Sequence, residues 1–130
     1  MKLVIINYGA GNIQSIKFAF ERLGVHAILS DDADEIKAAD KVIFPGVGEA
    51  SSAMAKLKAT GLDKVIPTLK QPVLGICLGM QLMCNHSTEG DTTGLGIFDV
   101  NVVKFSNKVK VPQIGWNEIT ALQSPLFTGI

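Results

Sequence analysis

One cysteine of the sequence is bracketed by glycines, in the pentapeptide Gly75-Ile76-Cys77-Leu78-Gly79. This is the spacing of a nucleophile elbow, a sharp strand-to-helix turn that needs small residues two positions to either side. Such a turn lifts the thiol to the top of a sheet and to the start of a helix, where the thiolate is favoured. The backbone N–H of Leu78 would face a developing oxyanion. The spacing predicts nucleophilic catalysis by Cys77, against the alternative of a buried structural cysteine.

A second glycine turn, Gly46-Val47-Gly48, follows an apolar run at 41–44. Its glycines allow the backbone to approach a ligand closely and allow a peptide group to reorient. The turn is therefore a candidate source of a second oxyanion N–H, or a place where substrate is held. An ordinary strand-to-helix turn fits the same residues, and the sequence leaves both interpretations open.

A third glycine turn invites comparison with dinucleotide-binding loops. Gly9 and Gly11 match the first two glycines of that fingerprint, and Asp31 or Asp32 lies about 20 residues further on. Gln14 stands where a tightly packed helix needs the third glycine. The match is partial, so we expect no nucleotide cofactor and no cofactor of any other kind.

Two polar residues follow the cysteine at distances that suit substrate binding. Gln81 comes four positions after Cys77, one turn along the same helix face, and Glu89 comes at the start of the next loop. An amide and a carboxylate beside a nucleophile could hold an amino acid, with Glu89 on its ammonium group. Each residue alone is more often solvated surface.

The two histidines, His26 and His86, are not placed to activate the thiol. His26 starts a predicted strand, and His86 would lie about 13 Å along the helix that follows the elbow. A general base should come within about 3 Å of the proton that it accepts. Both histidines are interpreted as structural. No group of His, Cys and carboxylate residues has the spacing of a metal site, so no metal is expected.

The order of apolar segments predicts how these turns are brought together. Strand-like runs occur at 2–7, 25–30, 41–44 and 72–77, and helical patterns occur at 13–24, 32–39, 51–61, 62–69 and 79–86. This alternation predicts an α/β fold with a doubly wound, mainly parallel, flavodoxin-like sheet. Ligands bind such sheets outside the carboxyl ends of the strands, which is where the glycine turns lie.

The pattern changes in the last third of the sequence. Segments 97–105 and 113–120 look like strands, and they predict an antiparallel excursion after residue 96. Ser124 and Pro125 then match the cap and first position of a helix.

Composition bounds the class of protein. The 130 residues are 47% hydrophobic and 18% charged, which suits one globular domain, and the zero net charge offers no electrostatic footprint for nucleic acid or an anionic membrane. No apolar run is long enough to span a bilayer, and we expect no targeting segment. Cys77 and Cys84, the latter interpreted as core, would be too far apart on one helix to form a disulfide. A cytoplasmic location is therefore expected.

The motifs carry a family resemblance that covers essentially the whole sequence. They are, in order, YGAGNIQS, FPGVGEA, GICLGMQLM, STEG, GLG and KVPQIGWN. The sequence resembles the class I glutamine amidotransferases, and more narrowly it is similar to the glutaminase subunits of imidazole glycerol phosphate synthases. The resemblance implies that glutamine is hydrolysed to glutamate and ammonia through a thioester on the cysteine. Ammonia would pass to a cyclase subunit with a (β/α)8 barrel, in a heterodimer of the histidine pathway.

The resemblance also implies roles for individual residues. Cys77 matches the nucleophile, and Leu78 with the turn Gly46–Val47–Gly48 matches the oxyanion region. Gln81 and Glu89 match positions that hold glutamine.

The same resemblance implies a partner surface and a missing base. Asn12 and Trp116 match the surface that faces the cyclase, although Trp116 by itself would be assigned to a half-buried core. Family members complete a Cys–His–Glu triad from a C-terminal segment, which no residue of this sequence matches. We therefore expect one amidotransferase domain, residues 1–130, that is the N-terminal part of the family domain. Its glutaminase activity alone should be poor, because a general base typically contributes ~10²–10⁴-fold.

Two alternatives to a dedicated glutaminase stay open. One is a catalytically incompetent module that binds the cyclase, and the other is an enzyme of the same elbow architecture, such as a glutaminase of another pathway. Glutamine hydrolysis that depends on the cyclase would distinguish a dedicated glutaminase from an enzyme of another pathway with the same elbow architecture.

Overall fold

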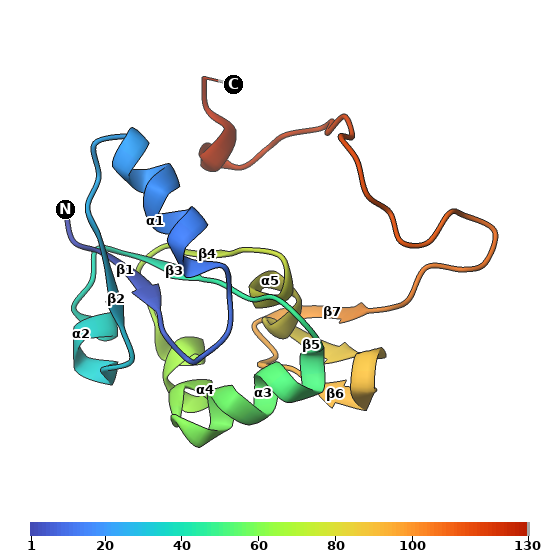
Figure 1. Ribbon diagram of the computed structural model, residues 1–130, viewed down its shortest axis with the longest axis horizontal. Coiled ribbons are helices and arrows are strands. Elements are labelled where there is room, and N and C mark those ends of the chain that lie inside the picture. The colour runs from blue at the N-terminus through green and yellow to red at the C-terminus, as the bar shows by residue number, and fades with distance from the viewer. Residues whose placement is uncertain (130) are drawn as a thin grey trace.

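Four parallel strands form the centre of the protein in a computed structural model, which describes residues 1–129 (Figure 1). The strands are β1 (Leu3–Ile6), β2 (Ala27–Ser30), β3 (Lys41–Phe44) and β4 (Val73–Gly75). The helices between them are α1 (Ile13–Arg22), α2 (Ala33–Lys37), α3 (Ala50–Ala59) and α4 (Leu62–Val65), which a 3-10 turn at Ile66–Thr68 continues. Each element falls within its predicted segment or one residue from it.

The strand order is β2-β1-β3-β4, and every neighbouring pair is parallel. Val4 of β1 lies opposite Ile28 on one side and Val42 on the other. The chain therefore moves outward from β1 to β2 and then returns past β1 to β3, which makes a topological switch point between β1 and β3. The predicted doubly wound parallel sheet is confirmed. The carboxyl ends of β1 and β3 lie side by side at the place where such folds bind ligands.

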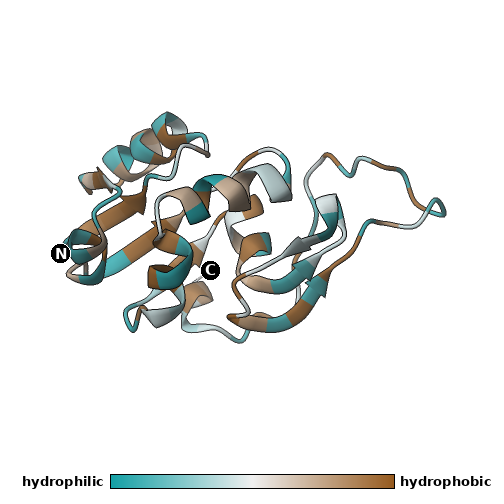
Figure 2. Ribbon diagram, turned by 90° about the horizontal axis from the view of Figure 1, so that it is seen from below, coloured by the Kyte–Doolittle hydropathy of each residue, from teal (hydrophilic) through white to brown (hydrophobic). Residues whose placement is uncertain are grey.

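Alternate strand residues supply two apolar cores, one on each face of the sheet. Leu3 and Ile5 belong to the core on which Ile16 of α1 packs. Val4 and Ile6 belong to the larger core, to which α2, α3, α4 and the later helix α5 (Leu78–Leu82) contribute. Figure 2 shows hydrophobic strands running between helices in which hydrophobic and hydrophilic residues alternate. Because helices cover both faces, these strands are continuous apolar runs in the sequence.

The chain after β4 departs from the predicted helix over 79–86. Helix α5 (Leu78–Leu82) has five residues, and strand β5 (Cys84–Ser87) follows it. The backbone of Leu82 and Cys84 accepts hydrogen bonds from Leu95 and Gly96, so sheet pairing replaces further helix formation. Cys84 and His86 therefore lie on a strand. The predicted separation of His86 from the elbow along one helix is wrong, and so is the helical separation of the two cysteines.

Strand β5 is the middle of a second sheet with the order β6-β5-β7. Strand β6 (Thr92–Thr93) is antiparallel to β5, whereas β7 (Phe98–Val102) is parallel to it, with His86 opposite Asn101. The predicted antiparallel excursion after residue 96 is therefore corrected. The reversal comes earlier, at β6, and the chain crosses back before β7 so that β7 joins the other edge in the direction of β5.

Residues 103–129 form an extended tail outside the two sheets (Figure 1). The strand predicted at 113–120 is wrong, because this segment pairs with no other strand among residues 1–129 and all its side chains are exposed. An apolar pattern without a neighbouring edge to pair with cannot form a sheet. Ser124 does cap a turn, since its hydroxyl oxygen accepts the N–H of Leu126 at 3.2 Å, but the turn is a single 3-10 turn at Pro125–Phe127.

Candidate active site

Cys77 occupies the turn between β4 and α5 with a strained backbone. Its φ is 53° and its ψ is −117°, a conformation that favours glycine, and its side chain is exposed. Holding a non-glycine residue there typically costs about 1–3 kcal/mol, so the surrounding structure must impose it. The sharp turn that the glycine spacing predicted is present, and it presents the thiol outside the carboxyl end of β4.

The two elbow glycines are required by tertiary contacts. A β-carbon at Gly75 would lie 2.6 Å from the Cα of Met80, and one at Gly79 would collide with the carbonyl oxygen of Phe44. A β-carbon at Gly46 would lie 2.5 Å from the backbone nitrogen of Gly79. The elbow and the Gly46 turn are therefore in backbone-to-backbone contact, which only glycine permits.

Several backbone donors in the elbow and in the Gly46–Gly48 turn have no partner in the part of the chain that the structure describes. Within residues 1–129, the N–H groups of Gly46, Val47, Gly48 and Leu78 donate no hydrogen bond. Leu78 is the first residue of α5, and N–H groups in a first helical turn have no intrahelical acceptor. Gly48 has a φ of +94°, which glycine adopts without strain. These free donors are the type that stabilises a developing oxyanion.

Cys77 and the glycine turn line one small pocket of about 280 Å³. Gly46 and Val47 are on one wall, and Asn12 is on the wall formed by α1. Asn12 is exposed, and its Oδ1 accepts the N–H of Ser15 at 3.4 Å as the N-cap of α1. The structure thus brings Cys77, the predicted oxyanion turn and Asn12 together.

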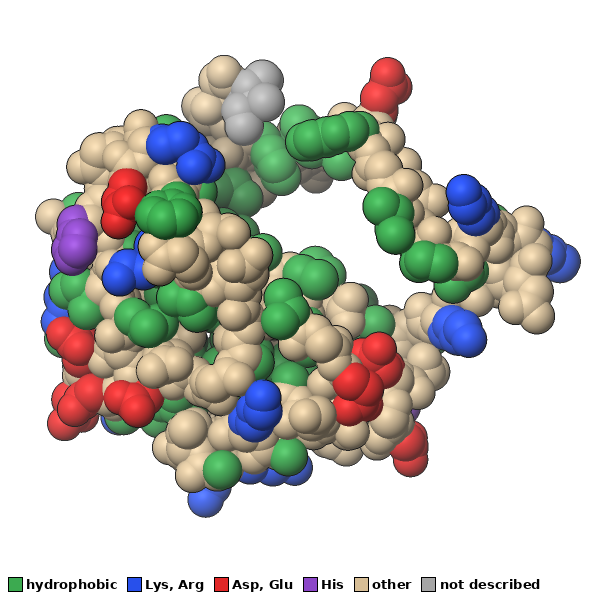
Figure 3. Space-filling view, in the orientation of Figure 1, with side chains coloured by type: hydrophobic (Ala, Val, Ile, Leu, Met, Phe, Trp, Pro, Cys, Tyr) green, Lys and Arg blue, Asp and Glu red, His purple; other side chains and the backbone are tan. Residues whose placement is uncertain are grey.

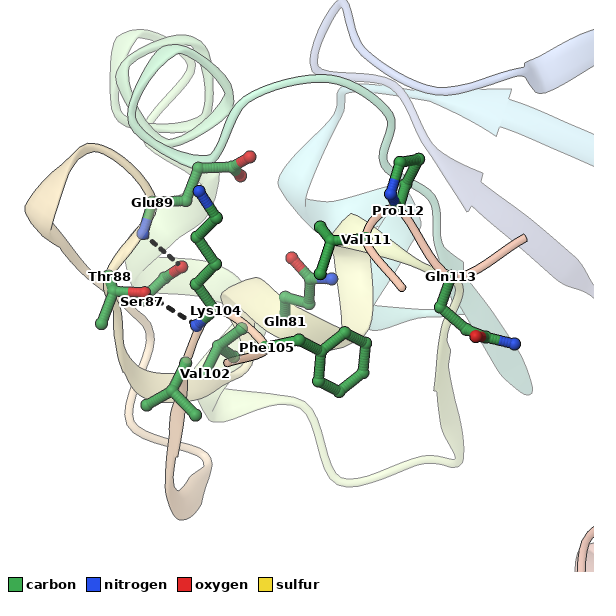
Figure 4. Close-up of a pocket in the computed structure, with 11 residues that line it drawn as sticks. Gln81, Ser87, Thr88, Glu89, Val102, Lys104, Phe105, Val111, Pro112 and Gln113 are labelled. Atoms are coloured by element: carbon green, nitrogen blue, oxygen red, sulfur yellow. Dashed lines mark hydrogen bonds between the residues drawn. The ribbon is translucent and has the colours of Figure 1, made fainter. Parts of the chain in front are cut away.

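Gln81 and Glu89 line a different and larger pocket, of about 560 Å³ (Figure 4). Cys77 does not line this pocket, although it is one helical turn away, since the N–H of Gln81 donates to the carbonyl oxygen of Cys77 at 3.1 Å. The structure therefore pairs the two predicted substrate residues with each other. It separates their pocket from that of the thiol by the first turn of α5.

The larger pocket contains residues that the sequence reasoning missed. They are Ser87, Thr88, residues 102–105 and residues 111–113. Lys104 is the cation among them, and Figure 4 shows its side chain extending towards Glu89. Its backbone N–H donates to Thr88 Oγ1 at 3.2 Å. The sequence signal for Lys104 was weak, because its position depends on the pairing of β5 with β7.

Two carboxylates meet at the start of α3. Glu89 Oε2 accepts the backbone N–H of Ala50 at 2.9 Å, and Glu49 caps the helix by accepting the N–H groups of Ser51 and Ser52. The hydrogen bonds from Ser52 and Ser51 hold the pKa of Glu49 below its usual range. One oxygen of Glu89 is therefore already used in joining its loop to α3. A carboxylate has further lone pairs with which it can accept from a ligand.

Neither histidine is brought to Cys77. His26 immediately precedes β2, so it lies at the amino end of one edge strand, whereas Cys77 follows the carboxyl end of the opposite edge strand, β4. His86 Nε2 lies 2.8 Å from Asp91 Oδ1, and His86 does not line the pocket of the thiol.

The residues of the partial dinucleotide fingerprint have structural partners. Asp32 caps α2 by accepting the N–H groups of Asp34 and Glu35, and these bonds, that of Glu35 first, lower its pKa. A β-carbon at Gly11 would lie 2.9 Å from Cβ of Pro45, so this glycine allows two loops to touch. Both residues have roles in the fold.

Three further features concern residues 1–129 alone. No three His, Cys, Asp or Glu side chains among them are grouped so as to hold a metal ion. None of their helices has the length and apolarity needed to cross a lipid bilayer. Trp116 is fully exposed on the tail, so the expectation of a half-buried core position from the residue type alone is wrong.

Comparison with known proteins places the chain in a family. The family described as glutamine amidotransferase class-I matches residues 4–129. "Imidazole glycerol phosphate synthase subunit HisH" of Bacteroides fragilis (strain YCH46) is 55% identical over 132 residues, and that of Bacteroides thetaiotaomicron is 54% identical. In both cases the match covers 99% of this chain and 67% of the relative.

A solved structure supports the fold. A crystal structure of a glutamine amidotransferase superposes with a TM-score of 0.65 at 19% sequence identity, covering 77% of this chain and 55% of that chain. At this identity the likeness shows the fold alone. The family matches confirm the resemblance that the motifs carried.

Proposed function

Because the chain belongs to the class-I glutamine amidotransferase family, we propose that it acts as the glutaminase subunit of an imidazole glycerol phosphate synthase in histidine biosynthesis. Its reaction is the hydrolysis of glutamine to glutamate and ammonia. The observation that supports this reaction best is the strained Cys77 turn, packed backbone-to-backbone against the Gly46 turn, with unpaired N–H groups in both turns.

The chemistry follows from that arrangement. The thiolate of Cys77 attacks the side-chain amide carbon of glutamine, a C–S bond forms, and the carbonyl electron pair moves to oxygen. The N–H of Leu78 and those of the Gly46–Gly48 turn stabilise this oxyanion. The electron pair of the oxyanion then re-forms the carbonyl as the C–N bond breaks, and the nitrogen takes up the proton that the Cys77 thiol had lost and leaves as ammonia. Water hydrolyses the thioester, which releases glutamate and regenerates the thiol.

The larger pocket supplies the amino-acid end of the site. Glu89 and Lys104 provide opposite charges, which suit the ammonium and carboxylate groups of free glutamine, and Gln81 adds an amide. The first turn of α5 separates this pocket from Cys77 by about the length of a glutamine side chain. We propose that glutamine lies along this turn with its side-chain amide at the thiol.

No side chain among residues 1–129 is placed to act as the general base of Cys77. The two histidines of this sequence are held elsewhere, and the matched region makes up 67% of the length of the Bacteroides relatives. We propose that residues 1–130 correspond to the N-terminal part of one amidotransferase domain. In a protein that carries the family's C-terminal segment, a His oriented by a Glu of that segment would take the proton of Cys77.

The relatives are named as subunits, so a partner subunit belongs to the proposal. It is a cyclase with a (β/α)8 barrel, which receives the ammonia in a heterodimer. Asn12, beside the thiol, and the exposed Trp116 are proposed as parts of the surface that meets it. The proposed location is the cytoplasm, where two unpaired thiols are chemically stable.

Release of glutamate and ammonia from glutamine tests this function. We expect weak turnover by the 130-residue chain and faster turnover when a cyclase subunit is added. Cys77→Ala should remove the activity, and Cys84→Ala, which changes a buried thiol of β5, is the matched control and should keep it.

Three outcomes would contradict the proposal. Equal turnover with Cys77→Ala would exclude the thioester route. Binding of the cyclase without any Cys77-dependent turnover, even when the family's C-terminal segment is supplied, would favour a docking module. Turnover that responds to the acceptor enzyme of another pathway, and not to the cyclase, would favour a glutaminase of that pathway.

A further inference from the structure

Tyr8 is the single tyrosine of the sequence, and it lies at the switch point of the sheet. It comes two residues after β1, and its side chain is only 3% exposed. Its ring packs against Phe44, the last residue of β3, with 5.6 Å between ring centroids. Tyr8 therefore joins the carboxyl ends of the two strands between which this fold binds ligands.

The hydroxyl of Tyr8 has one specific partner. It donates to the carbonyl oxygen of Pro45 at 2.8 Å, in a buried hydrogen bond. Pro45 directly precedes Gly46, and the preceding carbonyl, that of Phe44, accepts the N–H of Ile76 at 3.0 Å. Two successive carbonyl groups are thus held, one by the elbow strand and one by Tyr8, immediately before a turn whose own N–H groups are unpaired.

Neighbouring contacts hold Tyr8 and its loop in place. The loop carbonyl of Gly9 accepts a hydrogen bond from Lys56 Nζ at 3.1 Å. Gly11 approaches Pro45 so closely that a β-carbon there would lie 2.9 Å from Cβ of Pro45. These contacts hold the loop beside Pro45 without the hydroxyl. The Tyr8–Pro45 hydrogen bond therefore sets the orientation of the Pro45 carbonyl group, not the distance between the two loops.

We propose that Tyr8 is a positioning residue of the glutaminase: its hydroxyl holds the Pro45 carbonyl and thereby aims the N–H of Gly46, which belongs to the same peptide group, at the oxyanion. The inference rests on the proposed function, since it concerns the same reaction. Because a peptide group is planar, a hydrogen bond that holds its carbonyl oxygen also restricts the direction of its N–H. A donor that is already oriented needs no reorganisation when negative charge develops on the substrate oxygen. Tyr8 lines neither the pocket of Cys77 nor that of Gln81 and Glu89, so we expect it to contact neither glutamine nor the reacting atoms.

The hydroxyl keeps its proton over the working range of the site. Burial raises the pKa of Tyr8 to about 12, so it stays a donor at neutral and moderately alkaline pH. A carbonyl oxygen can only accept a hydrogen bond, so the Tyr8 hydroxyl is the donor and must keep its proton.

The matched variant is Tyr8→Phe, which removes one oxygen and keeps the ring against Phe44. The control is Thr60→Val, which also removes one hydroxyl that donates to a backbone carbonyl, that of Leu57 at 2.8 Å, but at the end of α3. Two readouts are needed. The first is the ¹⁵N order parameter of the amides of residues 46–48, and the second is kcat and KM for glutamine in the presence of the cyclase.

For Tyr8→Phe we expect the order parameters of residues 46–48 to fall from about 0.85 towards the ~0.6 of flexible backbone. We expect kcat to fall about tenfold, less than the ~10²–10³-fold loss of a whole oxyanion donor. KM should stay within about twofold, because the amino-acid end of glutamine is bound in the other pocket. Thr60→Val should change neither readout.

Unchanged order parameters at residues 46–48 would overturn the inference, whatever the activity. Looser amides with an unchanged kcat would overturn it too, because the hydroxyl would then order the turn without serving the reaction. A rise in KM equal to the fall in kcat/KM would mean that Tyr8 supports substrate binding instead. A wild-type protein that shows no glutaminase activity with the cyclase, even when the family's C-terminal segment is supplied, would refute the proposed function, and the order parameters would still decide whether Tyr8 holds the turn.

Discussion

The elbow region and the tail both carry a distinctive motif, but their surroundings differ. In residues 72–82 the glycines touch backbone of other elements, and Leu78 is buried. In residues 103–129 every side chain except Phe127 is exposed, and a β-carbon added at Gly115 would meet nothing within 4 Å. Figure 3 shows hydrophobic side chains along this tail, open to solvent.

This difference distinguishes residues whose type is required by packing within the chain from residues whose type suits a binding surface. The glycines of GICLGM are explained by packing within the chain, because any larger residue would collide with backbone. The Trp116 of KVPQIGWN has no such explanation, since it is fully exposed among residues 1–129. Large exposed apolar residues in a group mark surfaces for binding. The partner role of the tail therefore stays a prediction that rests on the family.

The largest expected effect is at Cys77 itself. Cys77→Gly should abolish glutamine hydrolysis, a loss of at least ~10³-fold, because the nucleophile is gone. The same change should leave the protein about 1 kcal/mol more stable than Cys77→Ala, since glycine accepts a φ of 53° without strain. Urea unfolding of the two variants measures the difference. Equal stabilities would mean that the elbow turn is not strained.

The next effect compares glycines of the two regions. Gly79→Ala should destabilise the protein by about 3 kcal/mol or more, because the new methyl would collide with the Phe44 carbonyl and must displace backbone. Gly115→Ala, where φ is +152° but space is open, should cost about 1 kcal/mol at most. Thermal or urea unfolding compares them. A Gly79→Ala protein as stable as the Gly115→Ala protein would contradict the packed elbow.

The third effect is a pH dependence that belongs to the packed region. The pKa of Tyr8 is about 12 in the folded protein against 10.0 ordinarily, so between pH 10 and 12 only the unfolded chain loses the phenolic proton. The contribution of the protonated phenol to stability is complete below pH 10. It is lost as the pH rises to 12, which lowers the free energy of unfolding by on the order of 1 kcal/mol.

Tyr8→Phe isolates this contribution from the lysines, which titrate over the same range. The free energy of unfolding of the wild-type protein should fall more steeply between pH 10 and 12 than that of Tyr8→Phe. Parallel curves for the two proteins would show that the phenol titrates as it does in water.

The smallest effect on stability is expected in the tail. Trp116→Ala should change the free energy of unfolding by less than about 0.5 kcal/mol, because the side chain is fully exposed. As the single tryptophan, Trp116 should fluoresce like indole in water and shift to shorter wavelength when the cyclase is added. A loss of 2 kcal/mol in Trp116→Ala would mean that the tail packs on the domain. Unchanged fluorescence with bound cyclase would remove Trp116 from the interface.

Much of the fold could be predicted because its signals are local. Apolar runs of β-branched residues, such as that of β1, and stop signals such as Gly24 placed the parallel strands and their helices. The region from Cys84 onward was predicted less well, since the helical pattern at 79–86 competes with pairing to strands that lie later in the sequence. Periodicity within a short segment cannot report on such partners.

By itself, the sequence determined the doubly wound sheet, the sharp turn at Cys77 and the family, because periodicity, glycine spacing and motif order are properties of the chain alone. Only the tertiary structure decided that Gln81 and Glu89 share a pocket with Lys104, that Cys77 shares one with Asn12, and that Tyr8 bonds to Pro45. These pairings join residues far apart in the sequence. They depend on strand register and on the contact of loops from different strands, which no local pattern encodes.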